Sequence, residues 1–297
     1  MNGITIGDIQ KKISDSLKKI DLTNREIQIE KNLIIVNTLG ISLKEVLLNQ
    51  NKKISDNQVR NIYGILERRI QHEPLAHIFG EWSFYGRLFY VNKHTLIPRP
   101  DTELIIDIVL NGYKNQKGLK ILDLGTGSGV IGITLALEMI EPDITICDIC
   151  PDALKVVSQN LQRFNIKNIK SIQSNWFQNI IQKNFDLIVS NPPYIDANDS
   201  HLTQPSIIYE PKKALVSENK GLADITVIIN QSKKYLRKEG RIIIEHGFDQ
   251  ANQIQNFFLT EQYDNIFSHK DINGKLDVYR LLIIIKKNYD ADSIIRP

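Results

Sequence analysis

Apolar side chains recur three or four residues apart through the first part of the chain, the spacing of one face of a helix. The repeating positions are Ile6, Ile9, Ile13, Leu17, Ile20, Ile27, Ile34, Ile35, Val59, Ile62, Ile65 and Leu66. Gly40 and the polar run at 49–51 are expected to separate the helical segments. Residues 1–73 are therefore predicted to form a small helical bundle, and they contain no cluster of catalytic side chains.

The pattern changes after residue 73. Residues 79–91 place aromatic side chains between glycines, which is typical of a β-hairpin, and we expect residues 74–97 to be a hairpin linker. Pro98 and Pro100 follow the hairpin and disfavour a helix immediately before them. Asp101 or Thr102 is expected to cap a helix that begins at Leu104.

Short apolar runs then alternate with amphipathic helical segments. The runs lie at 121–124, 144–147, 169–172, 187–189, 242–244 and 281–285, and the helical segments include 152–164 and 222–236. Strands separated by helices predict a parallel sheet that is covered on both faces. The fold class is therefore α/β, with a Rossmann-like domain over residues 98–297.

A glycine-rich loop follows the first of these strands. Gly125, Gly127 and Gly129 alternate with Thr126 and Ser128, and a helix is expected from the next residue. Glycines allow a sharp turn and the close approach of a ligand, and the turn directs the helix N-terminal amides at that ligand. The loop is thus expected to bind a cofactor.

Two acidic residues narrow the choice of cofactor. Asp148 ends the next strand and can accept hydrogen bonds from both hydroxyls of a ribose, which suits a nicotinamide dinucleotide and S-adenosylmethionine equally. Asp123 stands two residues before the first glycine, where it suits a cofactor with a positively charged amino-acid end. Asp123 thus favours S-adenosylmethionine, but these two residues alone leave a nicotinamide dinucleotide open.

Asn191, Pro192, Pro193 and Tyr194 follow the strand at 187–189, at the end of the sheet where ligand crevices lie. The Asn191 side-chain oxygen and the Pro192 carbonyl are two acceptors at a fixed separation, which suit the two hydrogens of a planar NH2 group. Tyr194 can stack on that group. Such nitrogens are poor nucleophiles, so oriented acceptors would stabilise their attack on a methyl sulfonium.

The chain resembles the bacterial peptide chain release factor glutamine methyltransferases (PrmC/HemK family) over nearly its whole length. The matching stretches are 73–80, 84–86, 96–103, 123–129, 148–154, 191–195 and 209–211. The resemblance implies transfer of a methyl group from S-adenosylmethionine to the glutamine of the Gly-Gly-Gln motif in class I release factors. Because a single glutamine offers little surface for selection, we also expect residues 1–73 to dock the release factor away from the Gly-Gly-Gln loop.

The resemblance assigns roles to individual residues. It implies cofactor contacts from Gly125, Thr126, Gly127, Ser128, Gly129, Asp148, Trp176 and Asn191. Asp123, through its charge, and Asn175, through its amide oxygen, are expected to contact the cofactor as well, and Asn191, Pro192 and Tyr194 are expected to be catalytic. Implied substrate contacts are Asn191, Pro192, Pro193, Tyr194 and Arg99. Three residues depart from the family pattern: Asn175 replaces a common aspartate, Cys150 a serine and His246 an apolar residue. We expect Asn175 to weaken cofactor binding, and His246 to be a neutral change rather than a general base.

Composition limits the remaining classes of protein. The longest apolar run has five residues, far short of the ~20 of a membrane span, and no secretory signal is visible. Two cysteines exclude a disulfide framework and favour a reducing compartment, so a cytoplasmic protein is expected. Cys147 and Cys150 have a C-x-x-C spacing, but no second cluster completes a metal site, and none is predicted.

Charge bears on the partner. The net charge is +3, and residues 1–73 hold 12 basic and 9 acidic side chains, so they carry the whole excess. This balance is too slight for a dedicated nucleic-acid binder. Three other readings stay open: a ribosomal-protein glutamine methyltransferase, a methyltransferase acting on exocyclic amines of DNA or ribosomal RNA, and a non-enzymatic scaffold that binds release factors.

Overall fold

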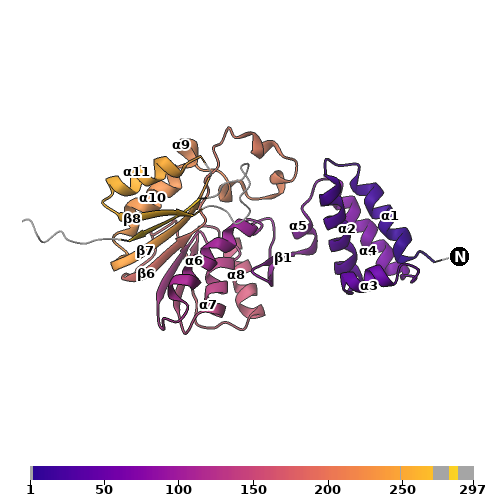
Figure 1. Ribbon diagram of the computed structural model, residues 1–297, viewed down its shortest axis with the longest axis horizontal. Helices are drawn as coiled ribbons and strands as arrows, with labels where there is room; N and C mark the ends of the chain where they lie inside the picture. The colour runs from indigo at the N-terminus through magenta and orange to yellow at the C-terminus, as the bar shows by residue number, and fades with distance from the viewer. Residues whose placement is uncertain (1–2, 248, 270–280, 287–297) are drawn as a thin grey trace, which may run out of the picture. The chain divides into compact units, whose positions relative to one another are not determined.

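A computed structural model describes residues 3–247, 249–269 and 281–286, and divides the chain into two compact units, Met1–Phe79 and Gly80–Pro297 (Figure 1). The first unit includes the short helix α5 (Leu75–Phe79), whereas the hairpin belongs to the second unit. Residues 74–97 are thus shared between the units, and their role as a linker stays a prediction.

The first unit is helical. Its longer helices are α1 (Ile6–Leu17), α2 (Asn24–Leu39), α3 (Leu43–Leu48) and α4 (Asp56–Arg69). Each begins with a capping box, in which the N-cap hydroxyl and the side chain three residues later bond reciprocally to the backbone. The sequence predicted three helical segments and missed α3, because six residues are too short to show a period. The Ser42–Glu45 capping box was the available signal.

The second unit opens with the predicted hairpin. Strand β1 (Glu81–Phe84) pairs with β2 (Arg87–Tyr90) in an antiparallel register, and Tyr85 and Gly86 form the turn with positive φ angles of 48° and 71°. Two positive φ angles give a turn the twist of the strands it joins. The fold class predicted from the sequence, an α/β sheet with a helical bundle and a hairpin, is confirmed.

A seven-stranded sheet forms the centre of this unit, in the order β5-β4-β3-β6-β7-β9-β8. Its strands are β3 (Lys120–Leu124), β4 (Asp143–Asp148), β5 (Lys170–Gln173), β6 (Phe185–Ser190), β7 (Leu236–His246), β8 (Asp264–His269) and β9 (Leu281–Lys286). Five neighbouring strands, β5, β4, β3, β6 and β7, are parallel to one another, whereas β9 runs antiparallel to both β7 and β8. The expectation that 281–285 joins a parallel sheet is wrong, and β8 was missed because it contains no apolar run.

Helices cover both faces of the sheet, as Figure 1 shows. They are α6 (Glu103–Tyr113), α7 (Val130–Glu138), α8 (Pro151–Arg163), α9 (Glu218–Gly221), α10 (Ala223–Ser232) and α11 (Ala251–Thr260). Side chains of α6, α7 and α8 pack in one apolar core, and those of α10 and α11 in the other. Successive strand residues alternate between them: Leu187 lies in the first core and Ile188 in the second. No helix in the described ranges is long and apolar enough to cross a bilayer.

Helix α6 begins differently from the expectation. A 3-10 turn (Pro100–Thr102) precedes it, the helix starts at Glu103, and the N-cap residue Thr102 supplies no capping bond from its side chain. The Thr102 hydroxyl is used elsewhere, since it donates to Glu245 across the sheet at 2.7 Å. The Glu103 carboxylate instead accepts from the main-chain N–H of Tyr85 at 2.7 Å, which ties the hairpin turn to the start of α6.

Candidate active site

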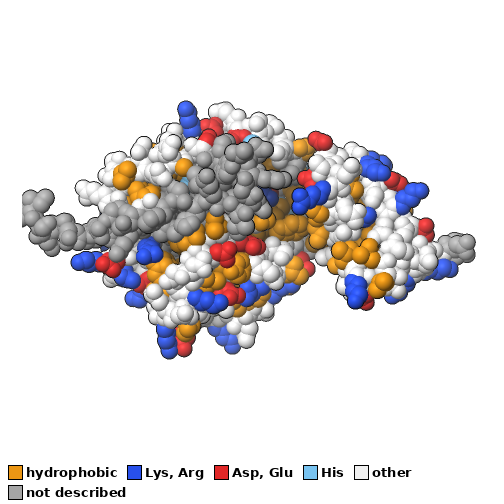
Figure 2. Space-filling view, viewed as in Figure 1, with side chains coloured by type: hydrophobic (Ala, Val, Ile, Leu, Met, Phe, Trp, Pro, Cys, Tyr) orange, Lys and Arg blue, Asp and Glu red, His pale blue; other side chains and the backbone are white. Residues whose placement is uncertain are grey.

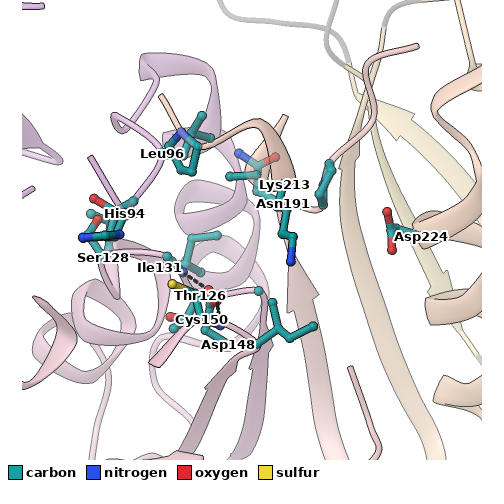
Figure 3. Close-up of a pocket in the computed structure, with 18 of the residues that line it drawn as sticks. His94, Leu96, Thr126, Ser128, Ile131, Asp148, Cys150, Asn191, Lys213 and Asp224 are labelled. Carbon is teal, nitrogen blue, oxygen red and sulfur yellow. Dashed lines mark hydrogen bonds between the residues drawn. The ribbon is translucent and has the colours of Figure 1, made fainter. Parts of the chain in front are cut away.

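A cavity of about 550 Å³ lies at the carboxyl ends of β3, β4 and β6. Its walls come from the glycine loop, the segment before α6, the ends of β4 and β6, the segment after β5, residues 211–216 and the start of α10. Figure 3 shows side chains of these segments around one space. Pockets of this size accommodate small molecules, and the carboxyl ends of strands are where α/β sheets bind them.

The backbone of the glycine loop has a conformation that residues with a side chain rarely adopt. Gly125, Gly127 and Gly129 have φ angles of 67°, 57° and 86°, all in the left-handed region. A β-carbon on Gly125 would also lie 3.2 Å from the ring of Trp176, and one on Gly129 would lie 2.8 Å from Ile133. Gly125 to Ser128 line the cavity, whereas Gly129 lies behind it at the start of α7.

Asp123 lies beneath the loop and does not line the cavity. Its Oδ2 accepts from the Thr126 hydroxyl at 2.6 Å and from the Gly132 N–H at 3.0 Å. Burial raises the pKa of this carboxyl to about 6. These two bonds hold the glycine loop to Asp123, and its predicted contact with the cofactor stays a prediction.

Asp148 lies on the cavity wall at the end of β4. Its Oδ2 accepts from the Gly127 N–H at 2.9 Å and its Oδ1 from the Cys150 N–H at 2.8 Å. Burial raises the pKa of Asp148 above its usual range. A carboxylate has about four acceptor positions, so each oxygen retains capacity for a hydroxyl in the cavity.

Trp176 stands beside Gly125 and lines the cavity with Asn175. Its backbone has a positive φ of 48°, and its indole N–H donates to Oδ1 of Asp224 at 3.0 Å. Asp224 also lines the cavity, and the sequence analysis missed it. A single aspartate near the start of a helix carries no distinguishing signal.

The segment from Asn191 to Tyr194 follows β6, as predicted. Asn191 and Pro193 line the cavity, whereas Pro192 is buried and Tyr194 lies outside the lining. The Tyr194 hydroxyl donates to Oε1 of Glu245 at 3.0 Å. The proposed contacts of these residues with a substrate stay predictions.

Arg99 lines the cavity, but its guanidinium forms an ion pair with Glu210. The other oxygen of Glu210 accepts from the Ile97 N–H at 3.0 Å. Glu210 therefore joins two walls of the cavity and neutralises much of the charge that Arg99 was expected to offer a substrate. In the sequence, Glu210 is recognisable only as part of the 209–211 motif, which does not indicate this ion pair.

His246 and the two cysteines do not form a reactive cluster. His246 is fully buried away from the cavity, and burial lowers its pKa to about 4, so it is neutral near pH 7. The Cys147 thiol is buried and donates to the carbonyl of Trp176, whereas Cys150 lines the cavity. The described part of the chain contains no group of three or more His, Cys, Asp and Glu side chains that could hold a metal ion.

Family models match most of the chain. One described as "Methyltransferase small domain" matches residues 102–265, and one described as "PrmC N-terminal domain" matches residues 8–80. The second model overlaps the helical unit, and the first contains every cavity residue from Thr102 onward.

Similar proteins agree with these matches. The chain is 39% identical to a release factor glutamine methyltransferase of Francisella tularensis, over 92% of this chain and 96% of that protein. It is 36% identical to a bifunctional methyltransferase of Rickettsia bellii over 92% of this chain, but spans about half of that relative, 54% of its length. A methyltransferase from Pyrococcus furiosus shares the fold, with a TM-score of 0.52 at 16% identity, over 80% of this chain and 100% of that chain.

Proposed function

Because the chain belongs to the family of release factor glutamine methyltransferases, we propose that it methylates the glutamine of the Gly-Gly-Gln motif in class I peptide chain release factors. The methyl group of S-adenosylmethionine is transferred to the side-chain amide nitrogen. The observation that carries this proposal is that Gly125, Asp148 and Asn191, from three separate strand ends, line one cavity.

The volume of the cavity and the polar groups on its wall suit S-adenosylmethionine. Asp148 would accept from the ribose hydroxyls with the acceptor capacity that its two backbone contacts leave. The glycine loop would lie along the amino-acid end, and Trp176 would flank the ligand. When bound, this cofactor supplies a methyl group on a positively charged sulfur.

The remaining chemistry belongs to the protein. Asn191 Oδ1 and the carbonyl of Pro192 would accept from the two hydrogens of the substrate NH2 group and hold its nitrogen in line with the methyl carbon. Positive charge develops on the amide as the nitrogen attacks, and these two acceptors stabilise it more in the transition state than in the ground state. Alignment supplies a further part of the acceleration.

A protein substrate accounts better for the surface of the helical unit than a nucleic acid does. Helix α3 exposes Leu43, Leu47 and Leu48, here called the α3 patch, and Figure 2 shows apolar side chains in this region. The positive excess of residues 1–73 is small. Exposed apolar groups are typical of protein contacts, whereas nucleic-acid sites are strongly basic. We propose that this unit docks the release factor, and that the protein acts in the cytoplasm.

The experiment is methylation with labelled S-adenosylmethionine. Purified class I release factor and the same factor with its Gly-Gly-Gln glutamine replaced by alanine are compared, and total ribosomal protein and duplex DNA are offered separately. Label on the intact factor alone, located on that glutamine by mass spectrometry, is expected. Label on ribosomal protein or nucleic acid in place of the factor would favour one of the two alternative substrates. Binding of the factor without any transfer would favour the scaffold.

A further inference from the structure

Four polar side chains form a chain of hydrogen bonds that begins at the cavity wall, where Asn191 and Thr102 lie, and continues to residues outside the lining. Asn191 Nδ2 lies 3.0 Å from the Thr102 hydroxyl, which lies 2.7 Å from Oε2 of Glu245. The other oxygen of Glu245 lies 3.0 Å from the hydroxyl of Tyr194. Thr102 and Glu245 are almost fully buried, so solvent cannot readily replace these contacts.

Donor and acceptor counting fixes the direction of this chain. A carboxylate can only accept, so the single hydroxyl hydrogen of Thr102 is donated to Glu245. The Thr102 oxygen can then only accept from Asn191. The group of Asn191 that faces Thr102 must therefore be its NH2, and its carbonyl oxygen must point the other way.

We propose, resting on the function proposed above, that Thr102 and Glu245 are positioning residues that orient the Asn191 amide. They hold its NH2 group against Thr102 and present its oxygen to the substrate. An amide that flipped would present donors, which would repel the NH2 group of a glutamine and attract the oxygens of a glutamate. The buried pair thus selects an NH2 group as the acceptor of the methyl group.

The same carboxylate also holds Tyr194. Because Oε1 and Oε2 of Glu245 bond to Tyr194 and Thr102, one rigid group fixes both ends of the Asn191–Tyr194 segment. Glu245 is in β7, next to the strand that leads into this segment, so the sheet sets their separation. Substrate contacts held by a buried group of the sheet need little rearrangement when the substrate arrives.

Thr102 provides the first test. Thr102→Val keeps the shape and removes the hydroxyl, and is expected to lower kcat about 10²-fold while KM and cofactor affinity change little. Thr102→Ser keeps the hydroxyl and is expected to restore most of kcat. A purely structural role predicts equal effects of both variants on kcat and on thermal stability, and that result would overturn the proposal.

A reversal of the hydrogen-bond chain provides the second test. Asn191→Asp alone places two carboxylates against one hydroxyl hydrogen, so kcat is expected to fall. Adding Glu245→Gln supplies a donor at the far end, which lets Thr102 donate to the aspartate at position 191. Recovery of kcat in the double variant above that of Asn191→Asp is expected. A double variant no better than the product of the two single effects would contradict the proposal.

A measurement on the unaltered protein separates this proposal from the proposed function and needs no variant to fold. The side-chain amide hydrogens of Asn191, observed by NMR, are expected to exchange with solvent more slowly than those of the exposed Asn111. Equal exchange rates would overturn the orientation of Asn191. Slow exchange in a protein that fails to methylate any release factor would uphold the positioning and overturn the proposed function.

Discussion

The side-chain amide of Asn160 donates a hydrogen bond of 2.8 Å to the main-chain oxygen of Ser128. Asn160 is in α8, and Ser128 is part of the glycine loop. The same side chain also bonds to both the N–H and the carbonyl of Tyr90 in the hairpin, at 2.7 and 3.0 Å. One buried amide therefore joins the hairpin to the cofactor loop.

Asn160→Ala is expected to destabilise the protein and to weaken cofactor binding, because it leaves polar groups of Tyr90 and Ser128 without their partner. A buried group without a partner costs about 1–3 kcal/mol, so we expect a loss of about 2–4 kcal/mol in the free energy of unfolding. Denaturant titration and calorimetry check both effects. Gln159→Ala, at an exposed position of the same helix, is the control. Wild-type cofactor affinity in Asn160→Ala would show that the bond from Asn160 to Ser128 is not needed for the cofactor-binding shape of the loop.

Asn191→Ala is expected to lower kcat by about 10²–10³-fold, because it removes one acceptor for the substrate NH2 group. The fold should persist, since Asn191 lies on a cavity wall. Steady-state methylation of the release factor and a thermal melt check this pair of outcomes. Asn198→Ala changes an exposed asparagine of the same loop and should leave kcat unaltered. Activity of Asn191→Ala within a few-fold of wild type would show that Asn191 is not an acceptor for the substrate NH2 group.

Asp148→Ala is expected to weaken S-adenosylmethionine binding through loss of the contacts to the ribose. Hydrogen bonds to a charged group contribute about 1.5–3 kcal/mol each, which corresponds to at least a tenfold rise in Kd. Isothermal titration calorimetry measures it. Asp152→Ala, in the first turn of α8 and outside the cavity lining, is the matched control. An unchanged Kd in Asp148→Ala would place the ribose elsewhere.

Asp123 predicts a pH dependence of stability. Burial raises its pKa in the folded protein to about 6, above the 3.8 that is usual for an aspartate, so the folded protein retains this proton to a higher pH than the unfolded chain does. The raised pKa therefore does not lower the free energy of unfolding below about pH 4. Between about pH 4 and 6 it lowers that free energy progressively, by about 3 kcal/mol at the end. Relative to wild type, Asp123→Asn should gain stability as the pH rises through that window. Parallel curves of unfolding free energy against pH would contradict this.

The α3 patch predicts a difference between protein and peptide substrates. Leu47→Ser combined with Leu48→Ser should lower kcat/KM on the intact release factor about tenfold or more, because docking raises the effective concentration of the Gly-Gly-Gln loop. Activity on a short Gly-Gly-Gln peptide should change little. Ile181→Ser, at an exposed position of the second unit, is the control. Equal losses on both substrates would assign α3 a structural role instead.

The fold could be predicted further than the site. Apolar periodicity located α1, α2 and α4, short apolar runs located the strands β3 to β7, and aromatic residues beside glycines located the hairpin. The three helices and the strands β3, β4, β6 and β7 bury the apolar positions that reveal them. Helix α3 and strand β8 escaped prediction because neither has a repeating apolar face over enough residues. The loops after β3, β4 and β6 could be located because the end of a strand is a local property of the chain.

The partners of the polar side chains could not be predicted. Thr102 had the sequence context of a helix cap, yet its hydroxyl bonds to Glu245, which is 143 residues away. The distance of Asp123 from the first glycine led to a predicted cofactor contact, but it gave no sign that the Gly132 N–H in α7 donates to this carboxylate. Spacing along the chain places a residue near a site, whereas its hydrogen-bond partners depend on the tertiary fold.

The strand order has a consequence for synthesis of the protein on the ribosome. Strand β9 lies between β7 and β8, and its Leu282 is opposite Glu245 in the register. Until residues 281–286 have emerged, β7 is an edge strand, with one row of backbone groups unpaired. Domains fold as their last elements become available during translation. Strand β7, which contains Glu245, therefore gains its partner β9 last. The segments that hold the glycine loop, Asp148 and Asn191 have all been synthesised before that.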